Sequence, residues 1–486
     1  MDLFTWFNSL LSVNITLFII GMTILSSLSF GVIFASSENL NFPNLLNALL
    51  FFTLFVITLL LVLVGNDFTA VCSSSYFFSQ HFQAIFLVLS IFVLLATRDF
   101  VSARKIIKFE YDSLMLFVIL SALCLCFADD FLLFYLAIEL QSLSFYVFAT
   151  FNRNSEFSTE SGLKYFVFGA IISCLLLLGF SMIYITFGST SFEFLMSLSQ
   201  VSSDSFLFLG LIFILVALLF KVGSAPFHAW LCDVYDGAII SVTLLFASAP
   251  KIVIFSIIMK IFLLVFIDFN LVWSPFFLLA SVLSITIGSI SAIYQKRLKR
   301  LFAYSTISHT GFILLGIACA SADAANSLIF YIVIYACLTI LMFSLLIFSV
   351  ITQTNFPGFI ANWTSSGLRN YVFVISFALV LFSISGIPPL AGFFSKLMIL
   401  LSLIAQEYYV TGLVIVIISS IASFYYIRLI KTFFFTKTSK NNFWLSTAKR
   451  QSSEFNIGLL FFLNLAFCFC PEFLSLMSVT LSLTLF

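Results

Sequence analysis

Long apolar stretches separated by short polar connections follow one another along almost the whole chain. Each stretch has about 20 residues, the length an α-helix needs to cross the hydrocarbon core of a membrane, and none has the alternation of a barrel strand. The pattern predicts an all-α polytopic membrane protein with about fourteen spans, at 9–35, 45–66, 82–98, 111–128, 131–151, 163–187, 206–226, 240–266, 271–294, 301–319, 324–352, 371–406, 410–435 and 456–482.

Two of these predicted spans contain helix-breaking residues. The seventh runs into Lys221 and then Gly223-Ser224-Ala225-Pro226, and the twelfth contains Gly386-Ile387-Pro388-Pro389 before Lys396. Glycine loosens a helix and proline removes a backbone donor, so we expect both helices to break. Unpaired backbone groups at membrane depth are tolerated only where protein or a water-filled cavity covers them. A lysine beside such a break is therefore a candidate ion or proton site.

Composition agrees with a membrane protein. The 486 residues are 62% hydrophobic and 8% charged, with a mean hydropathy of +1.20, whereas a soluble domain carries about 25% charged residues. A net charge of +1 provides no basic surface for nucleic acid. The nine cysteines lack the spacing of a zinc or iron–sulfur site, and we interpret them as small apolar fillers.

Positive charge is segregated between the two sides of the predicted membrane. When the connections between spans are assigned alternately to the two sides of the membrane, the basic connections, from the one around 98–108 to the one around 437–450, all fall on the same side. The connections of the opposite side and both termini carry no Lys or Arg. The positive-inside rule places the charged side in the cytoplasm or matrix and both termini outside. Four further lysines are not part of the charged connections and fall inside predicted helices: Lys221, Lys251, Lys260 and Lys396. One of them, Lys260, lies near an outer helix end, and we expect its side chain to extend outward.

Several ionisable residues are predicted near the middle of the membrane. Each mid-membrane charge costs roughly 2.5–3.5 kcal/mol, so these residues must be paired, hydrated or neutral. Burial favours a neutral amine and a nearby carboxylate favours an ammonium, so a lysine subject to both can change protonation when its partner moves. This behaviour is what a proton relay requires. The candidate relay residues are Glu139, Lys221, Lys251, His309 and Lys396, with His228 beside the first break as a further candidate.

Each candidate also has a structural interpretation. Glu139 and Lys221 could form a fixed ion pair, although a buried pair is weak support for stability. Lys251 could donate to the backbone near Pro250, and His309 could be a hydrogen-bonded core histidine. We interpret four tryptophans as anchors at the membrane interface: Trp230, Trp273, Trp363 and Trp444.

The two broken helices occupy matching places in two groups of five spans. In each group the second span holds an ionisable residue and the fourth is broken near a lysine. Because five is odd, the second group would cross the membrane inverted, as in many transporters. We therefore expect three N-terminal helices in 1–110, a first repeat in 111–266, an inverted second repeat in 267–436, and a loop with the last helix in 437–486.

Several long segments resemble the antiporter-like membrane subunits of respiratory complex I, and the N-type (chain 2) branch of that family in particular. The resemblance covers about 110–400, and its motifs are Phe131–Leu143, Glu160–Phe166, Phe220–Ala238, Ala249–Lys251, Ala303–Gly311 and Ser385–Lys396. In that family a glutamate on the fifth helix and a lysine on the seventh form a charge pair. A polar axis then continues through a lysine, a histidine and a further charged residue. The matching positions here are Glu139, Lys221, Lys251, His309 and Lys396.

The resemblance implies a proton-translocating core subunit that couples NADH-to-ubiquinone electron transfer to proton pumping. As an enzyme, the chain would be a subunit of NADH:ubiquinone reductase without a redox centre of its own, because it carries no nucleotide-binding, haem or iron–sulfur motif. We expect no cofactor or metal in this chain, whereas the complex as a whole uses NADH, FMN, iron–sulfur clusters and ubiquinone. The implied partners are other membrane-arm subunits and membrane lipids, with cardiolipin as a candidate, and no nucleic acid.

The N-terminal segment Met1–Trp6 has an acid and no basic residue, so it resembles neither a secretory signal nor an Arg-rich transit peptide. The 67 phenylalanines fit an AT-rich coding genome and favour the mitochondrial inner membrane, with both termini in the intermembrane space. The alternative location is a bacterial plasma membrane. Two alternative functions are a cation/proton antiporter subunit of a multi-subunit antiporter and a non-pumping structural subunit of the membrane arm.

Overall fold

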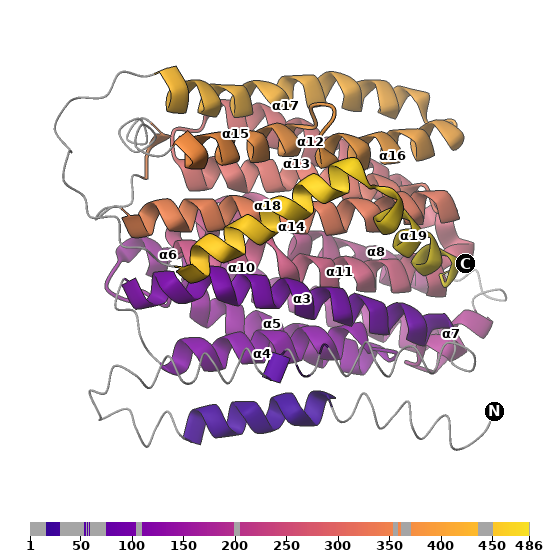
Figure 1. Cartoon of the computed structure of the whole chain (residues 1–486). Coiled ribbons are helices and arrows are strands. Elements are labelled where there is room, and N and C mark those ends of the chain that lie inside the picture. The colour runs from indigo at the N-terminus through magenta and orange to yellow at the C-terminus, as the bar shows by residue number, and fades with distance from the viewer. Residues whose placement is uncertain are drawn as a thin grey trace.

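The computed structural model describes residues 16–29, 53–54, 56, 58, 74–103, 109–198, 205–352, 358–360, 371–435 and 451–485. Within these ranges the regular structure is helical, with two isolated bridges and no strand. Figure 1 shows the long helices lying side by side with nearly parallel axes. The predicted all-α class is confirmed.

The helices have the following bounds: α3 Ser74–Ala103, α4 Phe109–Cys126, α5 Phe131–Ala149, α6 Glu156–Phe187, α7 Phe192–Leu198, α8 Ser205–Val222, α9 Ala229–Gly237, α10 Ile240–Ala247, α11 Ala249–Met259, η1 Lys260–Val265, η2 Ile267–Phe269, α12 Asn270–Tyr294, α13 Leu298–Ala318, α14 Ala322–Thr352, α15 Tyr371–Ser385, α16 Ala391–Ala405, α17 Tyr409–Phe435, α18 Gln451–Phe469 and α19 Glu472–Leu483. A further helix covers Thr16–Ser29.

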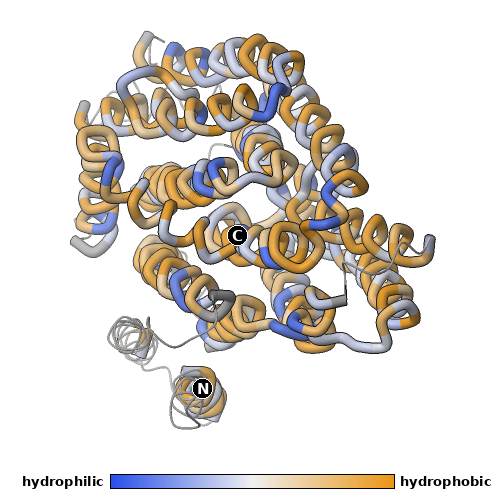
Figure 2. Tube along the Cα trace, turned by 90° about the vertical axis from the view of Figure 1, so that its right-hand side faces the viewer, coloured by the Kyte–Doolittle hydropathy of each residue, from blue (hydrophilic) through white to orange (hydrophobic). Residues whose placement is uncertain are grey.

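Nine helices in the described ranges are long and apolar enough to cross a membrane, or ten if the bent pair α18–α19 forms one span. The exact number of fourteen spans is not established by these residues. Seen along the helix axes in Figure 2, most of the tube is hydrophobic, including the outward-facing helices, with scattered hydrophilic positions. An apolar exterior is what a bundle surrounded by lipid requires.

The two predicted helix breaks are present. The first separates α8 from α9, and Gly223 in it has φ +79°; the second separates α15 from α16, and Gly386 has φ +84°. This left-handed region is open to glycine at no steric cost. At the first break the carbonyl oxygen of Phe220 accepts hydrogen bonds from the backbone N–H of Gly223 over 2.9 Å and from the indole Nε1 of Trp230 over 3.1 Å.

A third interruption lies near Pro250, inside a span that was expected as one helix. The expected continuous span 240–266 consists of α10, α11 and the π-helix η1, with a break at Ser248. Pro250 lies in the first turn of α11, where its missing N–H is harmless, but it could not have continued α10. The Ser248 hydroxyl donates to the carbonyl oxygen of Leu244 over 2.7 Å. Lys251 is therefore the third residue of α11 and lies in its first turn.

The last predicted span is also wrong as a continuous helix. Instead of one helix over 456–482, α18 and α19 are bent by 82° at a break that contains Pro471. The missing backbone donor of proline explains why α18 does not continue.

Helices α11, α13 and α14 form the centre of the bundle. The apolar windows of Ile240–Val265, Leu298–Ala318 and Ala322–Ile351 are 100%, 94% and 89% buried, against 39% for Glu156–Phe187 and 33% for Tyr409–Phe434. The central helices therefore carry Lys251 and His309 away from lipid, while α6 and α17 line the periphery. The division into two inverted repeats stays a prediction.

The tryptophan interpretation is wrong where the structure describes it. Trp230 and Trp273 are buried, with 7% and 1% of their surface exposed, and both indole N–H groups donate to carbonyl oxygens at helix ends. A tryptophan can find a partner for its N–H inside protein as well as at an interface. Trp363 and Trp444 lie outside the described residues.

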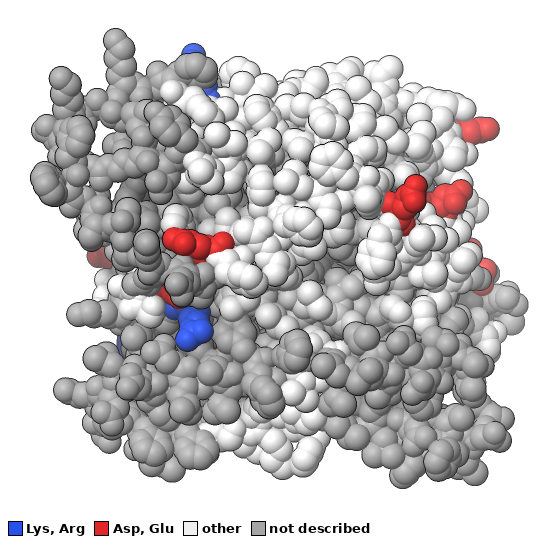
Figure 3. Space-filling model, in the orientation of Figure 1, with Lys and Arg blue, Asp and Glu red and all other residues white. Residues whose placement is uncertain are grey.

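Charge is distributed unevenly along the bundle axis. On the face drawn in Figure 3, the Lys and Arg of the described residues lie toward the left end, and the acids lie toward both ends. This distribution agrees with the segregation of basic residues in the sequence.

Candidate functional site

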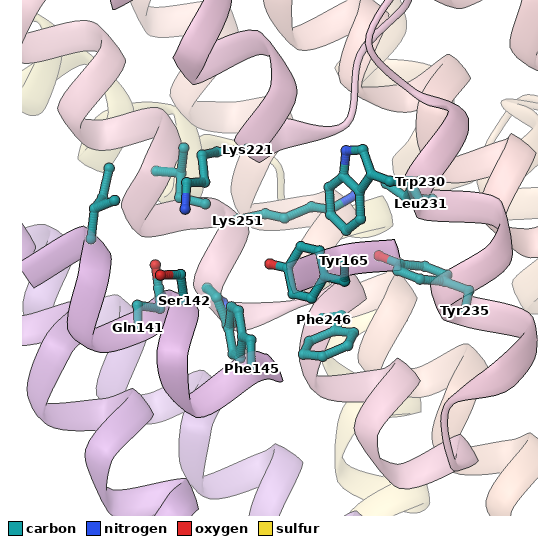
Figure 4. A pocket seen from close by; sticks show the side chains of 13 residues that line it. Gln141, Ser142, Phe145, Tyr165, Lys221, Trp230, Leu231, Tyr235, Phe246 and Lys251 are labelled. Carbon is teal, nitrogen blue, oxygen red and sulfur yellow. The ribbon is translucent and has the colours of Figure 1, made fainter. Parts of the chain in front are cut away.

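The first break contributes to a small internal cavity between α5, α6, α8, α9 and α11. It has a volume of about 30 Å³, and Lys221 and Lys251 both line it together with Ser142, Tyr165 and Tyr235. Figure 4 shows these side chains converging from different helices. Since a water molecule needs roughly 10–15 Å³ and a small-molecule ligand several hundred, this volume fits one or two waters.

Glu139 lies beside this cavity on α5. Its Oε2 accepts a hydrogen bond of 3.2 Å from the hydroxyl of Ser142, which lines the cavity, and within the described part of the chain its buried Oε1 has no partner. Glu139 interacts electrostatically with Lys221, but among the described residues no direct ion pair joins the two. The fixed ion pair of the structural interpretation is therefore absent from these ranges, and the two charges are separated.

Lys251 is the more deeply buried of the two cavity lysines, with 5% of its surface exposed. Its Nζ has no hydrogen-bond partner among the residues that the structure describes. The expected alternative, donation to the backbone near Pro250, does not occur within them. A buried amine without a partner is costly for stability, so its place beside a water-sized cavity favours a function that uses the amine.

A second cavity of about 10 Å³ lies between α13, α14, α15 and α16. Its lining includes His309, Lys396, Tyr331 and Tyr335. The Nδ1 of His309 lies 2.7 Å from the hydroxyl of Tyr331, and its Nε2 lies 3.3 Å from that of Tyr426. The structure thus places the histidine and the lysine of the second group together, although their helices are far apart in the sequence.

Lys396 is positioned by the second break. Its Nζ donates to the carbonyl oxygen of Ser385 over 2.7 Å, at the end of α15, and lies 5.4 Å from the ring centroid of Phe312. A Cβ at Gly386 would lie 2.9 Å from Cδ of Lys396. The glycine therefore permits the turn and also leaves room for the lysine side chain.

His228 lies in the connection between α8 and α9, outside the linings of both cavities. Its buried Nδ1 has no hydrogen-bond partner in the described ranges. Burial lowers the pKa of the His228 imidazole from its ordinary value, and an interaction with the backbone of Pro226 opposes this effect. The structure does not bring this candidate together with the other five.

Lys260 is buried, and its ammonium lies at the C-terminal end of α4. Its Nζ donates to the carbonyl oxygens of Cys126 at 2.9 Å and Ala128 at 3.4 Å, and pairs with Oδ1 of Asp129 at 3.2 Å. It therefore satisfies the C-terminal carbonyls of α4.

An ion-pair cluster that sequence reasoning missed connects α9 to α6 and α13. Asp233 pairs with Lys164 at 3.0 Å and Arg300 at 3.2 Å, and Asp236 pairs with Arg297 and with Nε of Arg300 at 3.0 Å. These residues were recognisable only as loop charges in the sequence, because their pairing depends on how three helices pack. The cluster fixes the second half of the broken helix against the helix that carries His309.

A third, larger cavity of about 330 Å³ lies between α14, α16 and α19, near Asp323, Asn326, Ser327 and Ser402. The hydroxyls of Ser327 and Ser402 are 3.4 Å apart. Within the described ranges no group of three or more His, Cys, Asp and Glu residues could hold a metal ion.

Comparisons with known proteins give a consistent result. The family model of the NADH:quinone oxidoreductase/Mrp antiporter transmembrane proteins matches residues 128–424. NADH-ubiquinone oxidoreductase chain 2 of Marchantia polymorpha is 35% identical over 96% of this chain and 98% of its own length. NADH-quinone oxidoreductase subunit N of Pelagibacter ubique is 38% identical over 73% of this chain and 76% of its own length.

Solved structures show the same fold. A chain of respiratory complex I from Thermus thermophilus has a TM-score of 0.76 at 22% identity and covers 95% of this chain and 98% of that one. A chain of the Mrp complex from Dietzia has a TM-score of 0.80 at 18% identity, with coverages of 98% and 97%. With the family model matching more than half of its length, the chain belongs to the NADH:quinone oxidoreductase/Mrp antiporter family of membrane proteins.

Proposed function

We propose that this chain is a proton-translocating core subunit of the membrane arm of respiratory complex I in the mitochondrial inner membrane. One observation carries the proposal: two water-sized cavities, each beside a broken helix, hold the buried ionisable residues of the central helices. Membrane proteins keep such residues where ions or protons pass. Relatives named as subunits of NADH–ubiquinone and NADH–quinone oxidoreductase support the assignment to complex I.

Protons would be held and passed by five side chains in two groups. Glu139, Lys221 and Lys251 belong to the first cavity or its border, and His309 and Lys396 belong to the second. When the distance between Glu139 and Lys221 changes, the carboxylate favours the lysine ammonium more or less strongly, which shifts a proton toward or away from Lys251. A distant redox reaction that changes this distance would thereby be coupled to proton movement.

The proton would leave the relay from Lys396. One turn and a half farther along α16, Ser402 meets Ser327 of α14 at the wall of the 330 Å³ cavity. The ends of the helices at this cavity face away from the basic ion-pair cluster, which supports an exit on the outer side. We infer from the segregation of basic residues in the sequence that both termini would lie in the intermembrane space.

NADH, FMN, iron–sulfur clusters and ubiquinone would be bound by other subunits of the complex. The chain's enzymatic role is therefore that of a subunit of NADH:ubiquinone reductase. Its exposed apolar helices α6 and α17 would face neighbouring membrane-arm subunits or lipid, cardiolipin included. His228 would be a further proton-carrying residue of the relay, on the inner side of the first break.

The test is proton translocation by the intact complex in sealed membrane vesicles. Lys221→Ala, Glu139→Ala and Lys396→Ala should each lower the protons moved per NADH oxidised while the complex still assembles. The matched control is Lys431→Ala, since Lys431 is an exposed lysine of the peripheral helix α17. A normal proton ratio in assembled Lys221→Ala complex would remove that lysine from the mechanism.

A second candidate function is cation/proton exchange within a multi-subunit antiporter, supported by the likeness of the fold to a chain of the Mrp complex. Sodium-dependent proton exchange by vesicles that contain this chain, in the absence of NADH, would favour it. A purely structural subunit is the third candidate, and normal pumping after substitution of all five relay residues would favour that one.

A further inference from the structure

The two cavities that hold the relay residues have separate linings. Lys251 borders the first and His309 borders the second, and within the described ranges the two linings share no residue and no hydrogen bond joins Lys251 to His309. A proton moves between such sites only along groups that can both donate and accept. The question is which groups occupy the space between the cavities.

Tyr235 on α9 lines the first cavity. It is 1% exposed, and its hydroxyl has no hydrogen-bond partner among the described residues. In Figure 4 this hydroxyl points toward Tyr165 and the two lysines. Its hydroxyl also interacts with the side chain of Thr306 of α13. Thr306 precedes His309 by three residues, so Tyr235 lies beside the turn of α13 that leads to the histidine.

Tyr335 on α14 lines the second cavity. It is 6% exposed, and in the part of the chain described here its hydroxyl is likewise without a hydrogen-bond partner. Its ring centroid lies 5.3 Å from that of His309, and it lies one helical turn from Tyr331, whose hydroxyl meets Nδ1 of His309. Tyr335 also interacts electrostatically with Tyr235.

Two buried phenols without hydrogen-bond partners, one in the lining of each cavity, need an explanation. An unpaired buried hydroxyl destabilises a protein, and phenylalanine would fill the same volume. A phenol has one donor and two acceptor positions. It can therefore receive a proton from one neighbour and release its own to the next, and it regains its starting state when it rotates back.

We propose that the hydroxyls of Tyr235 and Tyr335 connect the two cavities and carry the proton between Lys251 and His309, directly or through one ordered water. This inference rests on the proposed function and adds two proton-carrying residues to it. The step is proton transfer without oxidation: on each hydroxyl one O–H bond forms as the other breaks, and no bond between heavy atoms changes. Tyr235 lies on α9, in the first predicted repeat, and Tyr335 lies on α14, in the second.

The experiment measures protons translocated per NADH oxidised by the intact complex with Tyr235→Phe, Tyr335→Phe or both. Phenylalanine keeps the ring and its packing and removes only the unpaired hydroxyl, so assembly should be unchanged. We expect each variant to lose as much pumping as Lys251→Met, because a series relay fails at any missing member. Combining either tyrosine variant with Lys251→Met should cause no further loss, and this non-additivity distinguishes a shared path from independent structural damage.

The matched control is Tyr111→Phe. Tyr111 is 3% exposed on α4, its hydroxyl also has no hydrogen-bond partner within the described ranges, and it lies outside both linings. Normal pumping by Tyr111→Phe with loss in the two junction variants supports the proposal. Normal pumping by Tyr235→Phe and Tyr335→Phe with loss in Lys251→Met overturns the tyrosine connection and leaves the relay standing. Normal pumping by all variants, Lys251→Met included, overturns the proposed function itself.

Discussion

Replacement of Lys251 by methionine separates a functional lysine from a structural one. The amine of Lys251 is buried and, within the described residues, has no hydrogen-bond partner, and it shares its cavity with Lys221. Methionine keeps most of the aliphatic side chain. The substitution removes an unpaired polar group whose burial costs about 1–3 kcal/mol, so Lys251→Met should stabilise the protein by that order while abolishing the chain's share of pumping.

The stability change is measurable as a shift in the temperature of dissociation or unfolding. With an unfolding entropy of about 2.1 cal/mol/K per residue, 486 residues give about 1 °C per kcal/mol, so the expected rise is about 1–3 °C. Protons per NADH should be measured on the same preparation in sealed vesicles. Function is then lost while stability is gained, the trade-off expected of a residue kept for activity.

Lys260→Met is the matched control, nine residues farther along the same interrupted span. The ammonium of Lys260 has three oxygen partners, at Cys126, Ala128 and Asp129. Its removal should lower stability by about 1.5–3 kcal/mol for the charged hydrogen bonds lost and leave the proton ratio of the assembled complex unchanged. A destabilised Lys251→Met complex that pumps normally would refute the reasoning, because it would assign Lys251 the structural role.

Three further predictions test particular contacts. Gly386→Ala should lower the free energy of unfolding by roughly 1–2 kcal/mol, because alanine is strained in the left-handed backbone conformation, and should lower pumping because the new Cβ displaces Lys396. Gly188→Ala is the control: its φ is also positive, at +72°, but nothing lies within 4 Å of the new Cβ, so only thermal stability should change. Ser402→Val should slow proton release, measured with a pH dye on the outer side of the membrane. Ser344 is a buried serine of α14 away from the large cavity, so Ser344→Val is the control. Equally slow release by the control would contradict an exit through that cavity. Asp236→Asn removes the pairs with Arg297 and Arg300 and should lower the free energy of unfolding by about 1–3 kcal/mol, measured by thermal unfolding. Glu160→Gln, at an exposed pair with Lys164, should lower it by less than about 1 kcal/mol. Equal effects of the two substitutions would show that the burial of Asp236 is irrelevant.

Much of the helical architecture could be predicted from local chemistry. The breaks at Gly223 and Gly386 follow from neighbouring glycine and proline residues, and their position does not depend on packing. The same reasoning failed at Ser248 and at Pro471, where a proline was present but the surrounding run was apolar enough to be interpreted as continuous. Hydropathy averages over a window of residues, so it detects a span more reliably than an interruption within it.

The residues of the candidate site were proposed from the sequence, whereas the distances between them came only from the structure. Ionisable residues stand out in an apolar sequence, which is why Glu139, Lys251 and His309 could be named in advance. Tyr235 and Tyr335 could not, because a tyrosine in an apolar span is ordinarily a packing residue, and only its neighbours show whether the hydroxyl has a partner. The separation of Glu139 from Lys221 was equally invisible, since a sequence motif carries no distance.

The sequence by itself determined that this protein is a bundle of membrane helices, where two of those helices break, and which charges are buried within it. These properties depend on the transfer of side chains and backbone groups out of water, which is a local quantity. The tertiary structure decided which polar groups share a site: Lys221 and Lys251 line one cavity, His309 and Lys396 line another, and Asp236 pairs with Arg297. Such meetings depend on the packing of helices distant in the chain, and the sequence of one helix contains no information on which neighbour will face it.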